Sequence, residues 1–229
     1  MDAQSPEYLA PRRCFRAPVA EIAEAASLLA KATDAHLAKD EAAATQFIRA
    51  ADMAEVRAWT ESLWGSAKVT PDLRHYIRYR PISASVPVVA KASRTRVRMP
   101  TAAQKAEVLA RYGRHCAFCG NPLIRAEVRN AFRRHYPEAA YWGATNTTQH
   151  AAFQCLWLQY DHVVPHARGG DESTGNLVPT CAGCNYGRVS MTLEEVGLLD
   201  PRLQPIRVSD WDGLERILTP RCSQPASSG

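Results

Sequence analysis

The sequence of 229 residues predicts an α+β fold. Apolar side chains recur at helical spacing through residues 18–65, which predicts a helical module near the N-terminus. Further along, residues 153–164 form a mostly apolar run that is typical of a strand. Two Cys-x-x-Cys pairs lie on either side of this run, and pairs at such spacing are typical of metal ligands. We therefore expect a helical module followed by a small domain that a metal ion stabilises.

The helical module at residues 18–65 should contain two or three short helices. Their apolar faces are Val19, Ile22, Ala26 and Leu29, then Ala44, Phe47 and Ile48, then Val56, Trp59 and Leu63. The module has eight acidic and four basic side chains, so it is a poor candidate for binding a phosphate backbone. We expect it to act as a scaffold or to contact a protein partner.

The segments that flank this module differ in charge. Residues 1–17 are expected to form a flexible arm that is either unstructured or loosely docked. Residues 66–100 contain eight basic side chains and one acidic side chain, which gives a local charge of +7. Two interpretations of this basic linker stay open: a solvated connection, or an arm that lies along the phosphates of a nucleic acid. In the second interpretation Arg94, Arg96 and Arg98 would contact the substrate.

Residues 101–200 form the main predicted domain. Thr101 and Gln104 fit a capping box, which should open a helix that runs to about Arg111. Thr192 and Glu195 repeat the pattern before another short helix. Residues 201–229 should form a short C-terminal helix and a disordered tail rich in Pro and Ser.

The cysteine pairs predict a structural zinc site. Each Cys-x-x-Cys turn brings two sulfurs to one metal ion, and two turns complete a closed tetrahedron. The predicted Zn²⁺ ligands are Cys116, Cys119, Cys181 and Cys184. The remaining thiols, Cys14, Cys155 and Cys222, are interpreted as buried or incidental. Two histidines lie near the cysteines in sequence, His115 and His150, and they are interpreted as ordinary residues rather than as further ligands.

Composition also limits the cellular setting. No apolar run approaches the ~20 residues that span a membrane, and the N-terminus lacks the apolar segment of a signal peptide. We therefore expect no membrane association and a cytoplasmic protein of bacterial or phage origin, in which cysteines stay reduced. The formal net charge of +5 favours an anionic partner. The oligomeric state stays open.

A second set of residues is interleaved with the second cysteine pair. It consists of Asp161-His162-Val-Val-Pro165, Arg168-Gly-Gly170, Gly175-Asn176-Leu177 and Cys181-Ala-Gly-Cys184-Asn185. In this order and spacing the sequence resembles the HNH endonucleases of the ββα-metal (His-Me finger) superfamily. The third motif position is Asn185 rather than histidine, so the resemblance is to the HNN-type variant.

The resemblance implies a fold of two antiparallel strands and a helix around one divalent ion. It also implies that His162 is the general base, that Asp161 and Asn185 bind the ion, and that Asn176 positions the loop. A histidine has an ordinary pKa near 6.5, which suits the deprotonation of water near neutral pH. Because both expected ligands are oxygen donors, Mg²⁺ or Mn²⁺ should serve as the catalytic ion.

Two neighbours are candidate substrate contacts. Arg168 precedes a Gly-Gly turn where a phosphate could approach closely, and it is either a phosphate contact or a simple loop charge. His166 is either a substrate contact or a surface histidine. The leading hypothesis is therefore an endonuclease that acts on DNA and nicks it as a monomer. The alternative is a zinc-stabilised module that binds nucleic acid without catalysis.

Overall fold

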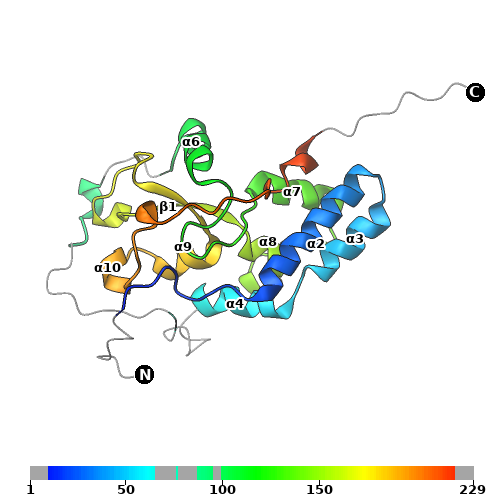
Figure 1. Ribbon diagram of the computed structural model, residues 1–229, viewed down its shortest axis with the longest axis horizontal. Helices are drawn as coiled ribbons and strands as arrows, with labels where there is room; N and C mark the ends of the chain where they lie inside the picture. Colours follow the sequence, from blue (N-terminus) through cyan, green and yellow to red (C-terminus); the bar gives the residue numbers. More distant parts are fainter. Residues whose placement is uncertain (1–9, 65–75, 77–86, 95–98, 220–229) are drawn as a thin grey trace, which may run out of the picture.

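The N-terminal module folds into three helices. The computed structural model describes residues 10–64, 76, 87–94 and 99–219 (Figure 1). The helices are α2 (Ala20–Leu37), α3 (Glu41–Ala50) and α4 (Ala54–Trp64), in agreement with the apolar spacing. α2 and α3 lie side by side, and Asp40 begins α3 by accepting a hydrogen bond from the Ala43 amide (2.9 Å).

A two-stranded antiparallel sheet lies at the centre of the C-terminal half. Strand β1 (Leu158–His162) pairs with β2 (Leu177–Cys181), and α9 (Ala182–Arg188) follows β2 without a loop. All of β2 is buried, and α9 contacts both strands. The chain thus has the predicted α+β fold, with a ββα unit at its centre and a helical N-terminal region (Figure 1).

Helix α6 (Ala102–Tyr112) covers β2 and begins with the predicted capping box. The Gln104 amide donates to Thr101 Oγ1 (3.2 Å), and the Thr101 amide donates to Gln104 Oε1 (2.8 Å). The helix ends at Gly113, whose φ of 70° lies in the region that favours glycine. Helix α10 (Leu193–Val196) begins with the other predicted box, at Thr192 and Glu195.

The strand expected at residues 153–164 begins later than predicted. Helix α8 (Ala151–Cys155) occupies the first part of this run, and β1 starts only at Leu158. Every side chain of α8 is buried, because the helix contacts α2, α4 and α9. A short helix that is buried on all sides has no polar face, so its sequence is indistinguishable from that of a buried strand.

The described part of the expected flexible arm is docked on the domain. The Arg12 amide donates to Gly197 O (3.0 Å), and the Leu199 amide donates to Arg12 O (2.9 Å). Phe15 is only 3% exposed and belongs to the hydrophobic core. Residues 10–17 therefore pack as a fixed segment, because burial of Phe15 offsets the entropy of ordering them. Residues 1–9 lie outside the described chain.

The C-terminal segment contains 3₁₀ turns where a short helix was expected. They are η4 (Pro201–Leu203) and η5 (Glu215–Leu218). The expected disordered tail from residue 220 lies outside the described residues. Much of the basic linker also lies outside the described residues. The structure describes its residues 76, 87–94 and 99–100, which include a 3₁₀ turn, η1 (Lys91–Ser93).

Helix α4 joins the N-terminal module to the ββα unit. Its Trp59 and Leu63 are buried and pack against Gly183 of α9, where an added Cβ would lie 3.1 Å from Trp59 Cζ3 and 3.3 Å from Leu63 Cδ1. Buried side chains of both halves form one continuous core. The predicted boundary near residue 65 therefore does not separate two independent cores.

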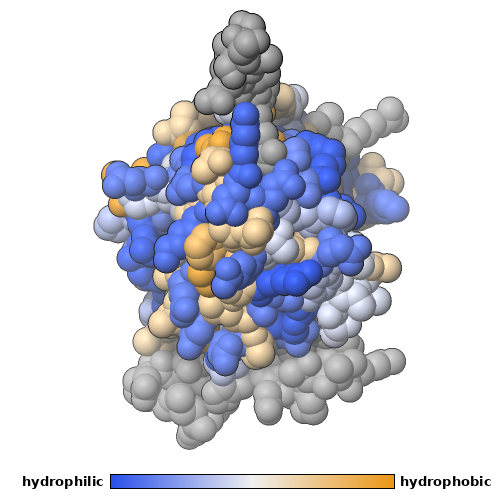
Figure 2. All heavy atoms as spheres, turned by 90° about the vertical axis from the view of Figure 1, so that its right-hand side faces the viewer, coloured by the Kyte–Doolittle hydropathy of each residue, from blue (hydrophilic) through white to orange (hydrophobic). Residues whose placement is uncertain are grey.

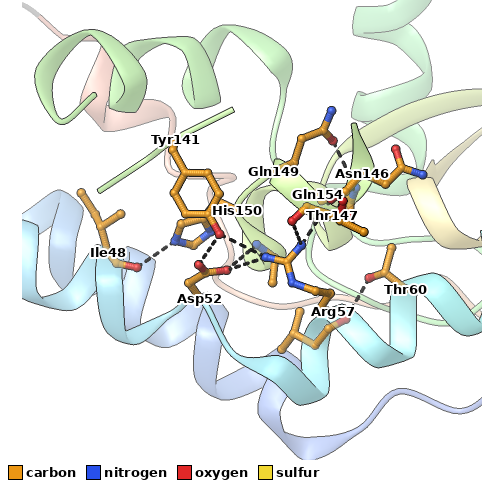
Figure 3. A network of polar contacts seen from close by, with 12 residues as sticks. Ile48, Asp52, Arg57, Thr60, Tyr141, Asn146, Thr147, Gln149, His150 and Gln154 are labelled. Carbon is orange, nitrogen blue, oxygen red and sulfur yellow. Dashed lines mark hydrogen bonds and ion pairs between the residues drawn. The ribbon is translucent and has the colours of Figure 1, made fainter. Parts of the chain in front are cut away.

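A polar network also links the N-terminal module to the C-terminal half (Figure 3). Asp52, between α3 and α4, accepts hydrogen bonds from Tyr141 Oη (2.6 Å) and the Ala151 amide (2.7 Å) and pairs with Arg57 (3.2 Å). His150 is fully buried, and its Nε2 contacts Ile48 O (2.9 Å). These contacts link helices of the module to the loop that precedes α8.

The outer face of the module is mostly hydrophilic, with a narrow apolar band along it (Figure 2). In the described part of helices α2–α4, Leu37 at 38% is the exposed large hydrophobic side chain. In the part of the chain that the structure describes, no helix combines the length and the apolar character needed to cross a membrane.

Candidate nuclease site

The ββα unit presents three predicted site residues to one cleft. Asp161 and His162 end β1, where the register sets them opposite Val178 and Leu177. Asn185 lies in the first turns of α9. All three line a cleft of about 1610 Å³. His162 and Asn185 are 23 positions apart in the sequence, and they lie at one cleft because α9 folds back along the strands.

Asp161 forms a buried ion pair with Arg188. Arg188 Nη2 lies 2.7 Å from Asp161 Oδ1, and Arg188 Nε lies 3.0 Å from Oδ2, so the contact is bidentate. The arginine is fully buried. It also donates to the carbonyl oxygens of His162, Val163 (3.2 Å) and Met191 (2.8 Å). Burial raises the pKa of the Asp161 carboxyl, and the guanidinium opposes that rise.

The Asn176 side chain is hydrogen-bonded to two other points of the loop that joins the strands. Its Oδ1 accepts from the Val164 amide (2.8 Å), and its Nδ2 donates to Val164 O (3.0 Å) and Asp171 O (2.8 Å). Gly170 packs beside it, where an added Cβ would lie 1.8 Å from Val164 O. Asn176 does not line the cleft, and its contacts are those of a residue that positions the loop.

His162 and His166 lie near each other at the cleft wall. Their ring centroids are 6.2 Å apart, and both rings line the cleft. His162 is 8% exposed, whereas His166 is half-buried in the 3₁₀ turn η3 (His166–Arg168). The structure therefore places His166 where a substrate contact is possible.

Arg168 does not line this cleft. Its Nη2 pairs with both carboxylate oxygens of Glu195 (2.8 and 3.1 Å), and its Nε donates to Ser190 O (3.2 Å). Since these contacts tie the loop to α10, the predicted phosphate contact of Arg168 finds no support in this arrangement.

Basic side chains outnumber acidic ones along the cleft. The basic residues are Lys91, Arg94, Lys105, Arg114 and Arg125, and the acidic ones are Glu127 and Asp161. Arg114 and Arg125 both pair with Glu215, at 3.3 and 2.5 Å. Arg94, predicted as a substrate contact, thus lies at the cleft, whereas Arg96 and Arg98 fall outside the described residues.

The four predicted zinc ligands form one cluster. One sulfur from each of Cys116, Cys119, Cys181 and Cys184 lies within 4.8 Å of the others, a separation that is consistent with a zinc site. Cys181 ends β2, and Cys184 lies in the first turn of α9. The first pair forms a tight turn, in which the Gly120 amide donates to Cys116 O (2.8 Å).

The electrostatics of this cluster favour a bound cation. Burial and the neighbouring sulfurs raise the pKa of Cys119 well above its ordinary value, and the neighbouring sulfurs raise that of Cys184. Four thiolates so close together would repel one another strongly in a buried site. A dication removes this cost, and thiolates are the ligands that zinc prefers.

Comparison with known protein families identifies the ββα unit. Residues 154–188 match the family model of the HNH endonucleases. The matched HNH segment begins in α8, includes both strands and α9, and ends at Arg188. A comparison with curated proteins and one with solved structures each gave no match.

Several residues at the HNH segment were not assigned a role from the sequence. Arg188 lies beyond the motif that ends at Asn185, although its position three residues after Asn185 on a helix is a usable signal. Lys105, Trp157 and Tyr186 also line the cleft. Their place depends on how α6 and α9 pack against β1, which no local pattern predicts.

Proposed function

We propose that this protein is a metal-dependent endonuclease that hydrolyses phosphodiester bonds in DNA. The observation that carries the proposal is the meeting of His162, Asp161 and Asn185 in one basic cleft on an HNH segment. Hydrolysis of a phosphodiester requires a base for the attacking water and positive charge near the phosphate. The cleft residues offer both.

In this proposal His162 is the general base. Its ring takes a proton from the water that attacks phosphorus, and Arg188 holds its backbone carbonyl in place. Asn176 fixes the ends of the loop that follows, which keeps the ring in one position relative to β2. Lys105 and Arg94 bind the phosphates of the strand, and His166 contacts the same strand.

The oxygen donors at the cleft fit a hard divalent cation. A carboxylate offers about four lone-pair sites, so the bidentate contact with Arg188 leaves Asp161 able to bind a metal ion. Asn185 adds an amide oxygen. Mg²⁺ or Mn²⁺ held there would stabilise the charge that develops on the phosphate and on the leaving 3′ oxygen. Zn²⁺ at the cysteine cluster would serve folding alone.

A second candidate is a zinc-stabilised module that binds nucleic acid without cutting it. The observation that favours it is the ion pair of Asp161 with Arg188, which compensates the charge of the expected metal ligand. Both candidates take nucleic acid as partner, and the helical module remains a possible contact for a protein partner. They differ in whether the cleft performs chemistry.

Relaxation of a supercoiled plasmid separates the two. The zinc-loaded protein is incubated with Mg²⁺, with Mn²⁺ or with EDTA added just before the DNA, and bound zinc is measured afterwards. We expect nicked circles with either metal ion and none with EDTA, because one active site per chain cuts one strand at a time. Retarded but fully supercoiled plasmid under every condition would instead support the binding module.

A further inference from the structure

The cleft has an aromatic wall that the proposed chemistry does not use. Trp157 directly precedes β1, and Tyr186 directly follows Asn185. Both line the cleft, and their ring centroids lie 6.5 Å apart with an interplanar angle of 47°. Tyr186 is 40% exposed. Two aromatic side chains therefore lie next to the site that would bind the scissile phosphate.

Trp157 contacts the buried guanidinium of Arg129. The guanidinium carbon of Arg129 lies 4.8 Å from the Trp157 ring centroid and 3.9 Å from that of Trp142. The two indoles meet edge to face at 5.8 Å. This stack fixes the orientation of Trp157, because both contacts depend on ring geometry.

Burial of the Arg129 guanidinium is unfavourable in free energy. The residue is 9% exposed, and its Nε and Nη1 have no hydrogen-bond partner among the residues that the structure describes. Burial lowers its pKa to about 10. A guanidinium without a carboxylate partner costs stability. Its position under Trp157 adds positive charge beneath the aromatic wall, which favours a ligand that combines a flat ring with negative charge.

A nucleotide has this combination of features. The same cleft carries Lys105 and Arg94, which suit phosphates, and aromatic faces, which suit bases. Bases in a continuous duplex are already stacked on both faces. A base can therefore reach the wall only when it is unpaired.

We propose that Trp157 and Tyr186 form a subsite that stacks one unpaired nucleobase beside the scissile phosphate. The inference rests on the proposed nuclease function and narrows its substrate class to single-stranded or locally unpaired nucleic acid. Stacking on an aromatic side chain contributes on the order of tenfold in affinity for each base. Arg129 acts as a positioning residue behind Trp157.

An abasic scan tests the subsite directly. Single-stranded oligonucleotides, each lacking one base at a successive position, are bound to the zinc-loaded protein without Mg²⁺, and affinity is read by fluorescence anisotropy. We expect one position to weaken binding about tenfold and the others less than about twofold. In Trp157→Leu the scan should be flat, whereas binding of a full duplex should match the wild type within about twofold.

Two further variants distinguish loss of the subsite from an effect on folding. Trp157→Phe keeps an aromatic ring and should retain the position at which a missing base weakens binding. Tyr186→Ala changes an exposed side chain, and most of the weakening at that position should disappear. A flat scan of the wild type, or an unchanged scan in both Trp157→Leu and Tyr186→Ala, would overturn the subsite. Plasmid nicking by the wild type is a separate readout, so a flat scan beside Mg²⁺-dependent nicking would refute the subsite and leave the nuclease function standing.

Discussion

Arg188 connects the parts of the candidate site through one guanidinium. It reaches from the last turn of α9 to the Asp161 carboxylate and to the carbonyl oxygens of His162 and Val163 at the end of β1. Because α9 also carries Asn185, the same residue sets the distance between the two expected metal ligands. A planar guanidinium with five N–H donors can make all of these hydrogen bonds at once, whereas the single ammonium group of a lysine cannot.

Removal of this guanidinium should destabilise the fold strongly. Arg188→Met leaves the Asp161 carboxylate buried without its partner, and loss of one member of a buried pair costs about 3–5 kcal/mol. Urea unfolding of the zinc-loaded protein without Mg²⁺ measures this change. The double variant Arg188→Met with Asp161→Asn should recover part of the loss, because the uncompensated charge is gone. Stability of Arg188→Met within about 1 kcal/mol of the wild type would contradict this account of the pair.

At the scale of elements, the sequence predicted those parts whose signals are local. The capping boxes at Thr101 and Thr192 and the cysteine pairs depend on residues a few positions apart, and each appears in the structure as expected. The resemblance to the HNH endonucleases implied that Asp161 and Asn185 share one site, and both line one cleft.

The features that the sequence did not predict depend on tertiary contacts. Helix α8 is buried on every side because three helices surround it, and its mostly apolar sequence resembled a strand. The segment at residues 10–17 has no periodic pattern, yet burial of Phe15 and two backbone hydrogen bonds to the chain near α10 hold it in place. The phosphate contact of Arg168 stays a prediction, and the structure adds a partner that no local pattern indicated, Glu195, 27 residues away.

The junction between α3, α4 and α8 should make stability sensitive to acid. Burial lowers the pKa of His150, whose Nδ1 has no hydrogen-bond partner within the described part of the chain. The unfolded chain takes up this proton near pH 6.5, whereas the folded chain does so only at lower pH. Stability is therefore complete above pH 6.5 and falls as the pH drops below it, by at most about 1.4 kcal/mol per pH unit for this one group.

Urea unfolding at pH 7.5 and 5.5 measures this effect. His150→Gln removes the titrating ring while an amide can still donate to Ile48 O, so the loss between the two pH values should shrink. An equal loss in wild type and variant would assign the acid sensitivity to other groups.

On the scale of the whole molecule, the zinc cluster and the helical module support the same core. Cys181 and Cys184 fix the start of α9, and Gly183 between them lets α4 approach closely. The module is therefore part of the same folded body as the HNH segment.

Loss of zinc should unfold this shared core. Structural zinc contributes roughly 10–16 kcal/mol of apparent binding free energy, which is comparable to the stability of a domain. We expect Cys181→Ser to lose bound zinc and its cooperative unfolding transition, as monitored by metal analysis and circular dichroism. Cys14→Ser, which changes a cysteine outside the cluster, should keep one zinc ion per chain. A folded Cys181→Ser without zinc would refute the structural role.

The basic cleft should give DNA binding a steep dependence on salt. Each phosphate contact contributes about 0.7–0.9 to the slope of log affinity against log salt concentration. Lys105→Ala and Arg94→Ala should each lower the slope by about that amount, whereas Arg49→Ala, on the exposed face of α3, should leave it unchanged. A slope that all three variants share with the wild type would place the bound strand elsewhere.

The single-turnover nicking rate of His162→Ala tests whether His162 is the general base. Wild type and variant, matched for zinc content and both saturated with DNA and Mg²⁺, are compared on the same plasmid, and DNA affinity is measured on the same samples. General-base catalysis contributes about 10²–10⁴-fold. The account predicts a loss of that size in the rate with affinity unchanged within about twofold, and an undiminished rate in His162→Ala would contradict it.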